Sequence, residues 1–337
     1  MREAYITLAH GSGGLAMHRL ICELFLEVFA DLELALLEDQ ARLPKLSGKL
    51  AFTTDAFVVD PIFFAGGDIG KLAVCGTVND LAVGGAKPLY LSCAFILEEG
   101  LALADLRRVA CSMREAAAEA GVRIVAGDTK VVPKGAADKV FIATCGVGEI
   151  PEDRELGAAH VRPGDKILVS GPIGEHGAAI LAARGELGMD CPVASDCRPL
   201  NRLVEQLLTA CPQGVRALRD PTRGGIAAVA NEFALASGCC LHLFEAQIPV
   251  REEVRGLCEL LGIDPWHLVC EGQFLAVVAP EVAEEALAAL KAHPDGQEAA
   301  IVGVVEATPS KTVVLHTLFG GQRLLDWPEG EPLPRIC

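Results

Sequence analysis

The sequence lacks a run of about 18 uninterrupted apolar residues, a CxxC pair and any excess of basic residues. The first absence argues against a membrane span, and the N-terminal stretch MREAYITLAHGSGG lacks the apolar run of a signal peptide. We therefore expect a cytoplasmic protein. The 29 Lys and Arg residues face 45 Asp and Glu residues, a net charge of −16. Such a chain repels phosphate backbones, so we expect no nucleic-acid partner.

The sequence also lacks the two best-known nucleotide-binding motifs. It has no Walker A sequence, which disfavours a P-loop. It has no complete GxGxxG either. Residues 11–16 fit only the looser form that ends in Ala, and the elements that follow do not form a clear βαβ unit. A standard dinucleotide-binding fold is therefore a weak interpretation.

Cysteines are few for a disulfide scaffold, 13 in 337 residues, and their number is odd. Most of them, such as Cys75, Cys93 and Cys145, lie in apolar runs typical of small core residues. Cys337 differs, because it is the last residue and follows a Pro-rich segment. It is either a chance terminal residue or a thiolate on a swinging arm that carries a group into a site, with Arg335 helping to hold it.

The length favours two domains, and the mixture of strands and helices favours an α/β (α+β) fold. Residues 151–165 are polar and rich in Pro and Gly, which is typical of a domain boundary. We predict a first domain over 1–155, a second over 156–318, and an extended tail with little regular structure over 319–337.

Hydrophobic periodicity predicts an amphipathic helix over 20–37, and residues 50–59 suggest two strands around a polar turn. Asp68 is expected to cap a helix that runs to Gly84, and a strand is expected to break at Gly127. Further strands are predicted at 88–97, 122–126, 139–149, 166–170, 240–245, 274–279 and 300–305, and further helices at 103–120, 224–236, 250–261 and 281–292.

Three carboxylates lie at positions where a charge needs a partner. Asp55 follows two threonines inside an apolar stretch, Asp80 follows Asn79 within a helix, and Asp128 follows a glycine after a strand. Each is either a magnesium ligand or an ordinary structural group: a turn cap, a solvated helix face and a Gly-Asp turn, respectively.

Two glycine-rich loops precede predicted helices and could bind phosphate. One is a connection built from His10, Gly11, Ser12, Gly13 and Gly14, which is equally typical of a flexible loop. The other is Asp220-Pro-Thr-Arg-Gly-Gly225, in which Arg223 and Gly224 open a helix; it could also be a plain helix N-terminus. Together with the carboxylates and Lys130, these loops make an inventory suited to magnesium and a triphosphate.

These motifs resemble the HypE family of hydrogenase-maturation proteins, within the superfamily of aminoimidazole ribonucleotide synthetase. The resemblance extends from Ala9 to the last residue, and the terminal Pro-Arg-Ile-Cys separates HypE from selenophosphate synthetase and thiamine-monophosphate kinase. The motifs that carry it are His10-Gly-Ser-Gly-Gly14, Thr53-Thr-Asp-Ala-Phe57, Asn79-Asp80, Gly127-Asp-Thr-Lys130, Asp220-Pro-Thr-Arg-Gly-Gly225 and Pro334-Arg-Ile-Cys337.

The resemblance implies a two-domain fold like that of aminoimidazole ribonucleotide synthetase, a homodimer paired through the first domain, and binding of ATP and Mg²⁺ near that pairing. It implies that the carbamoyltransferase HypF places a carbamoyl group on Cys337. The chain would then dehydrate this S-carboxamide to a thiocyanate in an ATP-dependent reaction. The cyano group would pass to the HypC–HypD complex and become the cyanide ligand of [NiFe]-hydrogenase.

The resemblance also implies roles for single residues. Glu271 would remove a proton, with Lys130 or Lys134 nearby. Glu271 could instead be a solvated loop carboxylate, and Lys134 could simply be a turn residue. Magnesium would bind Asp55, Asp80 and Asp128, and Lys71, Asn79 and Arg223 would contact the nucleotide or lie beside it. The alternatives are a kinase or synthetase that acts on a diffusible metabolite, a non-catalytic thiol carrier, and a cysteine-based redox sensor, which the missing CxxC disfavours.

Overall fold

The computed structural model describes residues 4–185 and 192–327, which form two compact units. Within the described residues, the first unit runs to Leu81 and resumes from Ala86 to Glu152, and the second contains Ala82–Gly85 and the chain from Asp153 onward. No helix in this part of the chain is long and apolar enough to cross a membrane.

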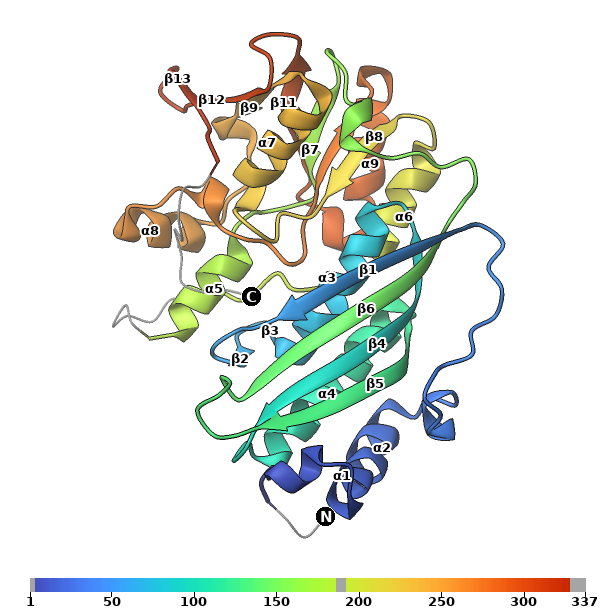
Figure 1. Cartoon of the computed structure of the whole chain (residues 1–337). Helices are drawn as coiled ribbons and strands as arrows, with labels where there is room; N and C mark the ends of the chain where they lie inside the picture. Colours follow the sequence, from blue (N-terminus) through green and yellow to red (C-terminus); the bar gives the residue numbers. More distant parts are fainter. Residues whose placement is uncertain (1–3, 186–191, 328–337) are drawn as a thin grey trace. The chain divides into compact units, whose positions relative to one another are not determined.

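The first unit is built on a four-stranded sheet with helices on one face (Figure 1). The strand order is β1-β6-β4-β5, in which only β4 and β5 run parallel. Helix α4 ends where Gly121 adopts a left-handed conformation (φ 75°). No helix among the described residues of this unit crosses the opposite face, which is turned toward the viewer in Figure 1. The elements are β1 (Lys49–Phe57), β2 (Phe63–Phe64), β3 (Gly67–Asp68), α3 (Ile69–Val83), β4 (Lys87–Glu98), α4 (Leu103–Ala120), β5 (Arg123–Val132) and β6 (Val140–Ile150).

The helix predicted over 20–37 is confirmed only over its first half, residues 20–29. Helical structure begins at Leu15 and ends at Phe29, because Ala30 turns into the left-handed region (φ 49°). Its middle part is a π-helical turn. The apolar period predicted the packed face, since Phe25 stacks on Phe95 of β4 with ring centroids 4.8 Å apart. The elements are η1 (Leu8–Gly11), α1 (Leu15–Leu20), η2 (Ile21–Leu26), α2 (Glu27–Phe29) and η3 (Leu34–Leu36).

The second unit contains a seven-stranded sheet in the order β13-β12-β9-β11-β7-β10-β8. Its strands are β7 (Lys166–Val169), β8 (Val215–Arg219), β9 (Cys240–Phe244), β10 (Leu275–Val278), β11 (Ala300–Glu306), β12 (Thr312–His316) and β13 (Gln322–Leu324). Its α-helices are α5 (Glu175–Ala183), α6 (Asn201–Ala210), α7 (Gly225–Ser237), α8 (Glu252–Leu261) and α9 (Ala283–Lys291). Its short 3-10 turns are η4 (Ala158–His160), η5 (Glu245–Gln247), η6 (Pro265–His267), η7 (Pro280–Val282) and η8 (Pro294–Gly296).

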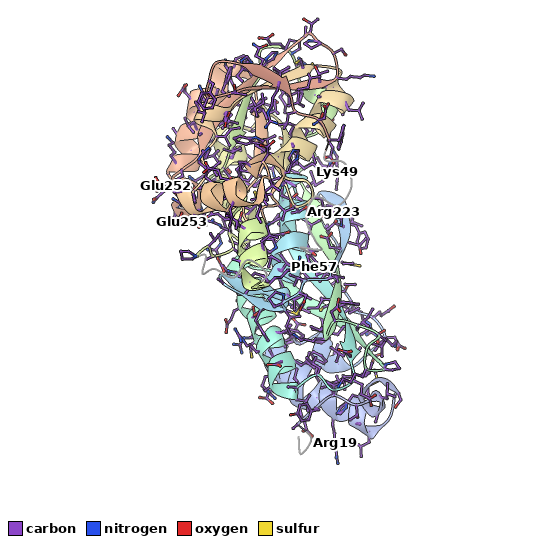
Figure 2. The ribbon with its side chains drawn as sticks, turned by 90° about the vertical axis from the view of Figure 1, so that its left-hand side faces the viewer. Arg19, Lys49, Phe57, Arg223, Glu252 and Glu253 are labelled. Carbon is purple, nitrogen blue, oxygen red and sulfur yellow. The ribbon has the colours of Figure 1, made fainter. Side chains whose placement is uncertain are left out.

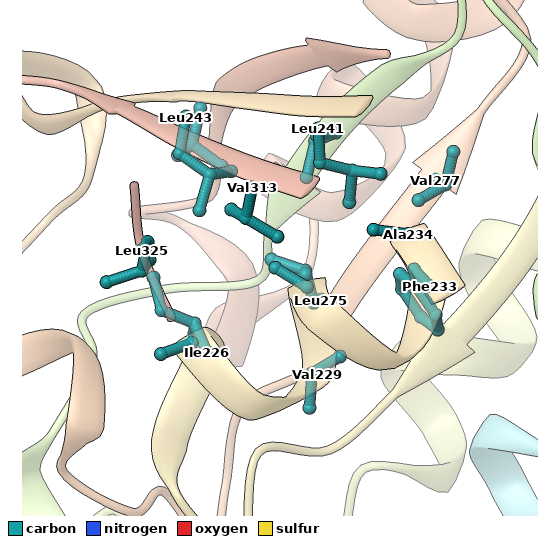
Figure 3. Close-up of a cluster of buried hydrophobic side chains, with 14 of the residues drawn as sticks. Ile226, Val229, Phe233, Ala234, Leu241, Leu243, Leu275, Val277, Val313 and Leu325 are labelled. Atoms are coloured by element: carbon teal, nitrogen blue, oxygen red, sulfur yellow. The ribbon is translucent and has the colours of Figure 1, made fainter. Parts of the chain in front are cut away.

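Two apolar cores hold this sheet between helices. On one side, α7 packs Ile226 and Phe233 against strand residues such as Leu241 and Leu275 (Figure 3). On the other side, α6 and α9 pack against the opposite faces of β7, β8 and β10. Burial on both faces explains why β10, whose four residues are all buried, is continuously apolar rather than alternating.

Two strand predictions in the first unit are wrong. Residues 49–57 form one strand instead of two around a turn, because every residue of β1 has a register partner in β6. The strand predicted to break at Gly127 continues to Val132, where Gly127 lies opposite Cys93. A Cβ on Gly127 would lie 2.8 Å from the Cys93 carbonyl oxygen, so the glycine permits close strand approach rather than a turn.

In the second unit, α6, β8 and β12 had not been predicted. The segment from 319 was expected to carry little regular structure, yet β13 pairs with β12, and Leu325 joins the core beyond it. The rest of the predicted tail, including Cys337, lies outside the described residues.

Candidate functional site

The polar centre of β1 faces α3. Thr53 donates a hydrogen bond from its hydroxyl to the Asp80 carboxylate on α3, with 2.7 Å between the oxygens. Asn79 is fully buried, and Asp80 is half-buried. The solvated helix face considered as an alternative for Asn79-Asp80 is therefore wrong.

Asp55 lies on the same face of the sheet as Thr53, two residues further along β1. Its register partner in β6 is Thr144, whose hydroxyl hydrogen-bonds Thr77 of α3. Side chains alternate along a strand, so Thr53, Asp55 and Thr144 all point toward the helix. The structure therefore brings Asp55 and Asp80 to the same side of the sheet.

Asp128 lies on the other face. Register partners connect it through Ala94 in β4 and Ala143 in β6 to Ala56, the residue after Asp55. Since neighbouring strands lie about 4.8 Å apart, β1 and β5 are separated by roughly 14 Å as well as by the sheet itself. Within one chain, the three carboxylates predicted to bind magnesium therefore do not lie together.

Asp128 forms an exposed ion pair with Lys130, 3.2 Å apart, and both lie within β5. The Gly-Asp turn considered for this motif is therefore wrong. Lys134 is exposed in the connection between β5 and β6. The structure thus places Lys130 on a rigid strand and Lys134 on a loop.

No group of three or more His, Cys, Asp or Glu side chains in the described part of the chain is arranged to hold a metal ion. This does not exclude Mg²⁺ as a partner of bound phosphate, because Mg²⁺ commonly uses one or two carboxylates together with phosphate oxygens and water. Asp55 and Asp80 fit that chemistry as a pair.

The first glycine-rich loop is partly structural. His10 is 2% exposed, and its Nδ1 accepts the Thr7 N–H at 3.1 Å, so it closes the short helix η1. A Cβ on Gly11 would lie 2.6 Å from the Val131 backbone nitrogen, which requires glycine for the approach to β5. Ser12, Gly13 and Gly14 are exposed before α1. Only these three present accessible groups of the kind that bind phosphate.

Lys71 lies in the first turn of α3. The Asp68 carboxylate accepts the N–H groups of Gly70 and Lys71 at 2.8 and 3.1 Å, so the predicted cap is confirmed. The Lys71 ammonium group donates to the Gly66 carbonyl at 3.1 Å. Lys71 and Asp80 are nine residues apart on α3, so they project from different sides of the helix.

In the second unit, the second glycine-rich loop opens α7, as predicted. Gly224 and Gly225 both have left-handed backbones, with φ values of 67° and 62°. A Cβ on Gly225 would lie 2.3 Å from the Trp266 carbonyl oxygen. Arg223 projects at the surface beside them (Figure 2), so its guanidinium group is accessible to an anion.

Glu271 is 2% exposed, so the solvated loop carboxylate considered for it is wrong. Its loop is connected to the second glycine-rich loop, because the Cys270 N–H donates to the Pro221 carbonyl at 3.0 Å. Burial raises the pKa of Cys270 well above its usual value, and the nearby carboxylates of Asp196, Glu271 and Glu175 raise it further. The charges of three acidic groups therefore act on one buried thiol.

Asp196 and Glu175 were not singled out from the sequence. Burial raises the pKa of both carboxyl groups, and Asp196 adds to the effect on Glu175. Ionised Asp196 therefore destabilises the folded state above its raised folded pKa, and this cost is relieved as the pH falls through that value. Asp196 lies in the irregular segment before α6, where neither helical nor strand periodicity could have found it.

Both halves of the chain match models of one protein class. Residues 37–150 match "AIR synthase related protein, N-terminal domain", and residues 162–316 match "AIR synthase related protein, C-terminal domain". The chain thus has the two-domain organisation of AIR-synthase-related proteins.

Similarity to individual proteins is higher and covers the full length. The carbamoyl dehydratase HypE of Rhodobacter capsulatus is 52% identical over 342 residues, covering 100% of this chain and 99% of that protein. HypE of Escherichia coli K12 is 53% identical over 337 residues, covering 98% and 99%. A crystal structure of HypE with ATP has a TM-score of 0.93 and 51% identity, covering 98% of this chain and 99% of the other. The chain belongs to the HypE family.

Another similar structure is a complex between two proteins. The crystal structure of the HypE–HypF complex contains a chain with a TM-score of 0.80 and 48% identity, covering 92% of this chain and 99% of the other. Thiamine-monophosphate kinases share the fold at 19–21% identity, with TM-scores of 0.58–0.63.

Proposed function

We propose that the chain is an ATP-dependent carbamoyl dehydratase, which converts an S-carboxamide on Cys337 into a thiocyanate. The observation that carries this proposal is the full-length identity of about half of all residues to carbamoyl dehydratases of the HypE family. The similarity to a HypE that binds ATP supports ATP as the co-substrate.

The chemistry explains what the protein must contribute. Bound ATP supplies the phosphoryl group that turns the poor carboxamide oxygen into a leaving group. Overall, S-carboxamide and ATP give thiocyanate, ADP, phosphate and one proton. One C–O bond breaks, and the nitrogen loses both of its protons. The chain must therefore orient the tail, screen the triphosphate and accept protons.

Glu271 accepts a proton from the carboxamide nitrogen in this proposal. It is 2% exposed, and its loop is tied to Pro221 by the Cys270 N–H, which fits a base that is held in place. Lys130 and Lys134 are the further candidates. Lys130 is on a strand beside Asp128, which limits its reach, whereas Lys134 is on an exposed loop.

Asp55 of β1 and Asp80 of α3 lie on the same side of the sheet, and we assign them to Mg²⁺, which would screen the triphosphate charge. Asp128 lies on the opposite face of the sheet, which is the face that we assign to the homodimer, so it does not join this pair. The resemblance to the HypE family is the reason for placing the ATP site near the pairing of two copies. We assign the contacts to phosphate or nucleotide to four groups: Arg223, the loop at Gly224, Lys71, and the exposed residues Ser12, Gly13 and Gly14 of the first glycine-rich loop.

The magnesium assignment predicts that Asp80→Asn lowers ATP-dependent phosphate release at limiting Mg²⁺ by at least about tenfold. The Asn side chain keeps the hydrogen bond from Thr53 but loses the charge that attracts the cation. Phosphate release would be measured with carbamoylated protein over a range of Mg²⁺ concentrations. Asp153→Asn, at an exposed position, is the control. An unchanged Mg²⁺ dependence in Asp80→Asn would contradict the assignment.

The open face of the first unit's sheet is the surface we assign to the homodimer. It carries large apolar side chains in solvent: Leu50 is 67% exposed, Phe52 64% and Ile96 39%. An uncovered apolar sheet face is typical of a protein interface. A second copy of the same sheet would cover it isologously.

Phe52→Asp is therefore expected to produce monomers. Each copy would bury an unpaired carboxylate, weakening the dimer by about 2–4 kcal/mol. Sedimentation velocity over a concentration series measures the change. Phe319→Asp, which replaces a 99% exposed side chain in the second unit, should leave the dimer intact. A dimer that persists in Phe52→Asp would exclude this face.

The remaining partners follow from the same proposal. The similar HypE–HypF complex supports HypF as a partner, and we assign the carbamoylation of Cys337 to it. The cyano group then passes to the HypC–HypD complex and on to [NiFe]-hydrogenase. A redox-sensor function is disfavoured, because burial raises the pKa of interior thiols, that of Cys258 to about 11, and so keeps them protonated.

A further inference from the structure

The peptide that carries Glu271 is held by a turn from another part of the chain. The Asp196 carboxylate accepts the Glu271 N–H through Oδ1 at 3.0 Å and the Gly272 N–H through Oδ2 at 3.2 Å. The Arg198 N–H lies 3.5 Å from the Glu271 carbonyl oxygen, on the other side of the same residue. The backbone of Glu271 is therefore held at both of its polar groups.

The contact is too close to tolerate a side chain at the next position. A Cβ on Gly272 would lie 1.8 Å from the Asp196 carbonyl oxygen. That carbonyl also accepts the Arg198 Nε–H at 3.1 Å, and the Arg198 Nη1 contacts Asp295 at 3.3 Å. The turn from Asp196 to Arg198 is thus braced by its own guanidinium group.

The choice of a carboxylate for this role has a cost. Asp196 is 5% exposed, and burial raises its pKa, whereas the N–H groups of Glu271 and Gly272 and the charge of Arg198 oppose that rise. An amide side chain in the same position would place its oxygen opposite one of the two N–H groups and its own NH2 donor opposite the other. Asp196 can satisfy both, and in doing so it fixes two successive peptides.

We propose that Asp196 is a positioning residue for the dehydration: by holding the Glu271 and Gly272 peptides, it aims the Glu271 carboxylate at the carboxamide nitrogen. This inference rests on the proposed function of Glu271 as the proton acceptor. A displacement of about 1 Å in a reacting group is enough to slow an enzymatic step about 100-fold.

The test uses the full-length chain, carbamoylated by its carbamoyltransferase and mixed with Mg-ATP in a single turnover. Loss of one water from the C-terminal peptide is followed by mass spectrometry across a pH series. We expect Asp196→Asn to slow this step about 10- to 100-fold, with the half-saturating ATP concentration unchanged. Asp153→Asn removes an acidic group from an exposed position that takes no part in this turn, and it should react at the wild-type rate.

A double-mutant cycle with Glu271→Gln separates positioning from general damage to the fold. If Asp196 acts through Glu271, Asp196→Asn costs little more in the Glu271→Gln background. If Asp196→Asn lowered the rate by the same factor in both backgrounds, the inference would be overturned and the role of Glu271 would stay intact. A wild-type rate for Glu271→Gln alone would instead refute the proposed proton acceptor, and the inference would fall with it.

A second variant keeps the test decisive if Asp196→Asn does not fold. Arg198→Gln removes the Nε–H that holds the Asp196 carbonyl but retains the backbone N–H of residue 198. We expect about a tenfold slower step that also vanishes in the Glu271→Gln background. A wild-type rate for a folded Arg198→Gln variant, or a loss independent of Glu271, would overturn the inference.

Discussion

Cys337→Ala is expected to abolish cyano-group formation completely, because the proposed reaction takes place on that sulfur atom. No other residue can substitute, since the carbamoyl group must be carried as an S-carboxamide on a thiol and dehydrated there to a protein-bound thiocyanate. The variant should retain its fold and its affinity for ATP. Hydrogenase activity in cells that depend on this chain measures the outcome, alongside the mass of the C-terminal peptide.

The matched control for thiol removal is Cys22→Ala. Cys22 is a half-buried thiol on the N-terminal helix, 3.6 Å from His18, and it has no role in the proposed reaction. Normal hydrogenase maturation in the Cys337→Ala variant would refute the carrier role. A kinase or synthetase with a diffusible substrate would then be the better interpretation of the fold.

Glu271→Gln is expected to slow the dehydration by about 100- to 10,000-fold, the range for loss of a general base. Carbamoylation of Cys337 should be unaffected, because the carbamoyltransferase catalyses that step. Single-turnover loss of water after addition of Mg-ATP measures the step. The step is followed over a range of pH in both proteins.

Glu253→Gln is the control for removal of an acidic group from the second unit. Glu253 is exposed in the first turn of α8 (Figure 2). It should react like the wild type at every pH. A Glu271→Gln variant with an unchanged rate and an unchanged pH profile would leave Lys130 or Lys134 as the proton acceptor.

Strong local signals predicted several elements correctly. The apolar period and Gly121 predicted α4, and Asp68 predicted the start of α3, because capping and amphipathic periodicity are local properties. The helix α6 and the strands β8 and β12 had not been predicted. Strand β12 is only five residues long and joins the sheet beside β9, a partner about 70 residues earlier in the chain. Such pairing depends on tertiary contacts.

The candidate site could be predicted from the sequence only in part, for the same reason. The motifs include Asp55 and Asp80, which the structure places on the same side of the sheet, and Glu271 and Pro221, whose loops are hydrogen-bonded through Cys270. The position of Asp128 could not be predicted, because its face depends on whether β5 continues through Gly127. Asp196 escaped prediction because nothing in its own segment indicates the Glu271 loop, 75 residues away in sequence.

The most direct test of the proposed reaction is the intact mass of the C-terminal peptide after incubation with the carbamoyltransferase and its substrates, before and after Mg-ATP. We expect one carbamoyl group on Cys337, followed by loss of one water only when ATP is present. A peptide that stays unmodified despite an active transferase, or that keeps its carbamoyl group in the presence of Mg-ATP, would contradict the proposed dehydratase.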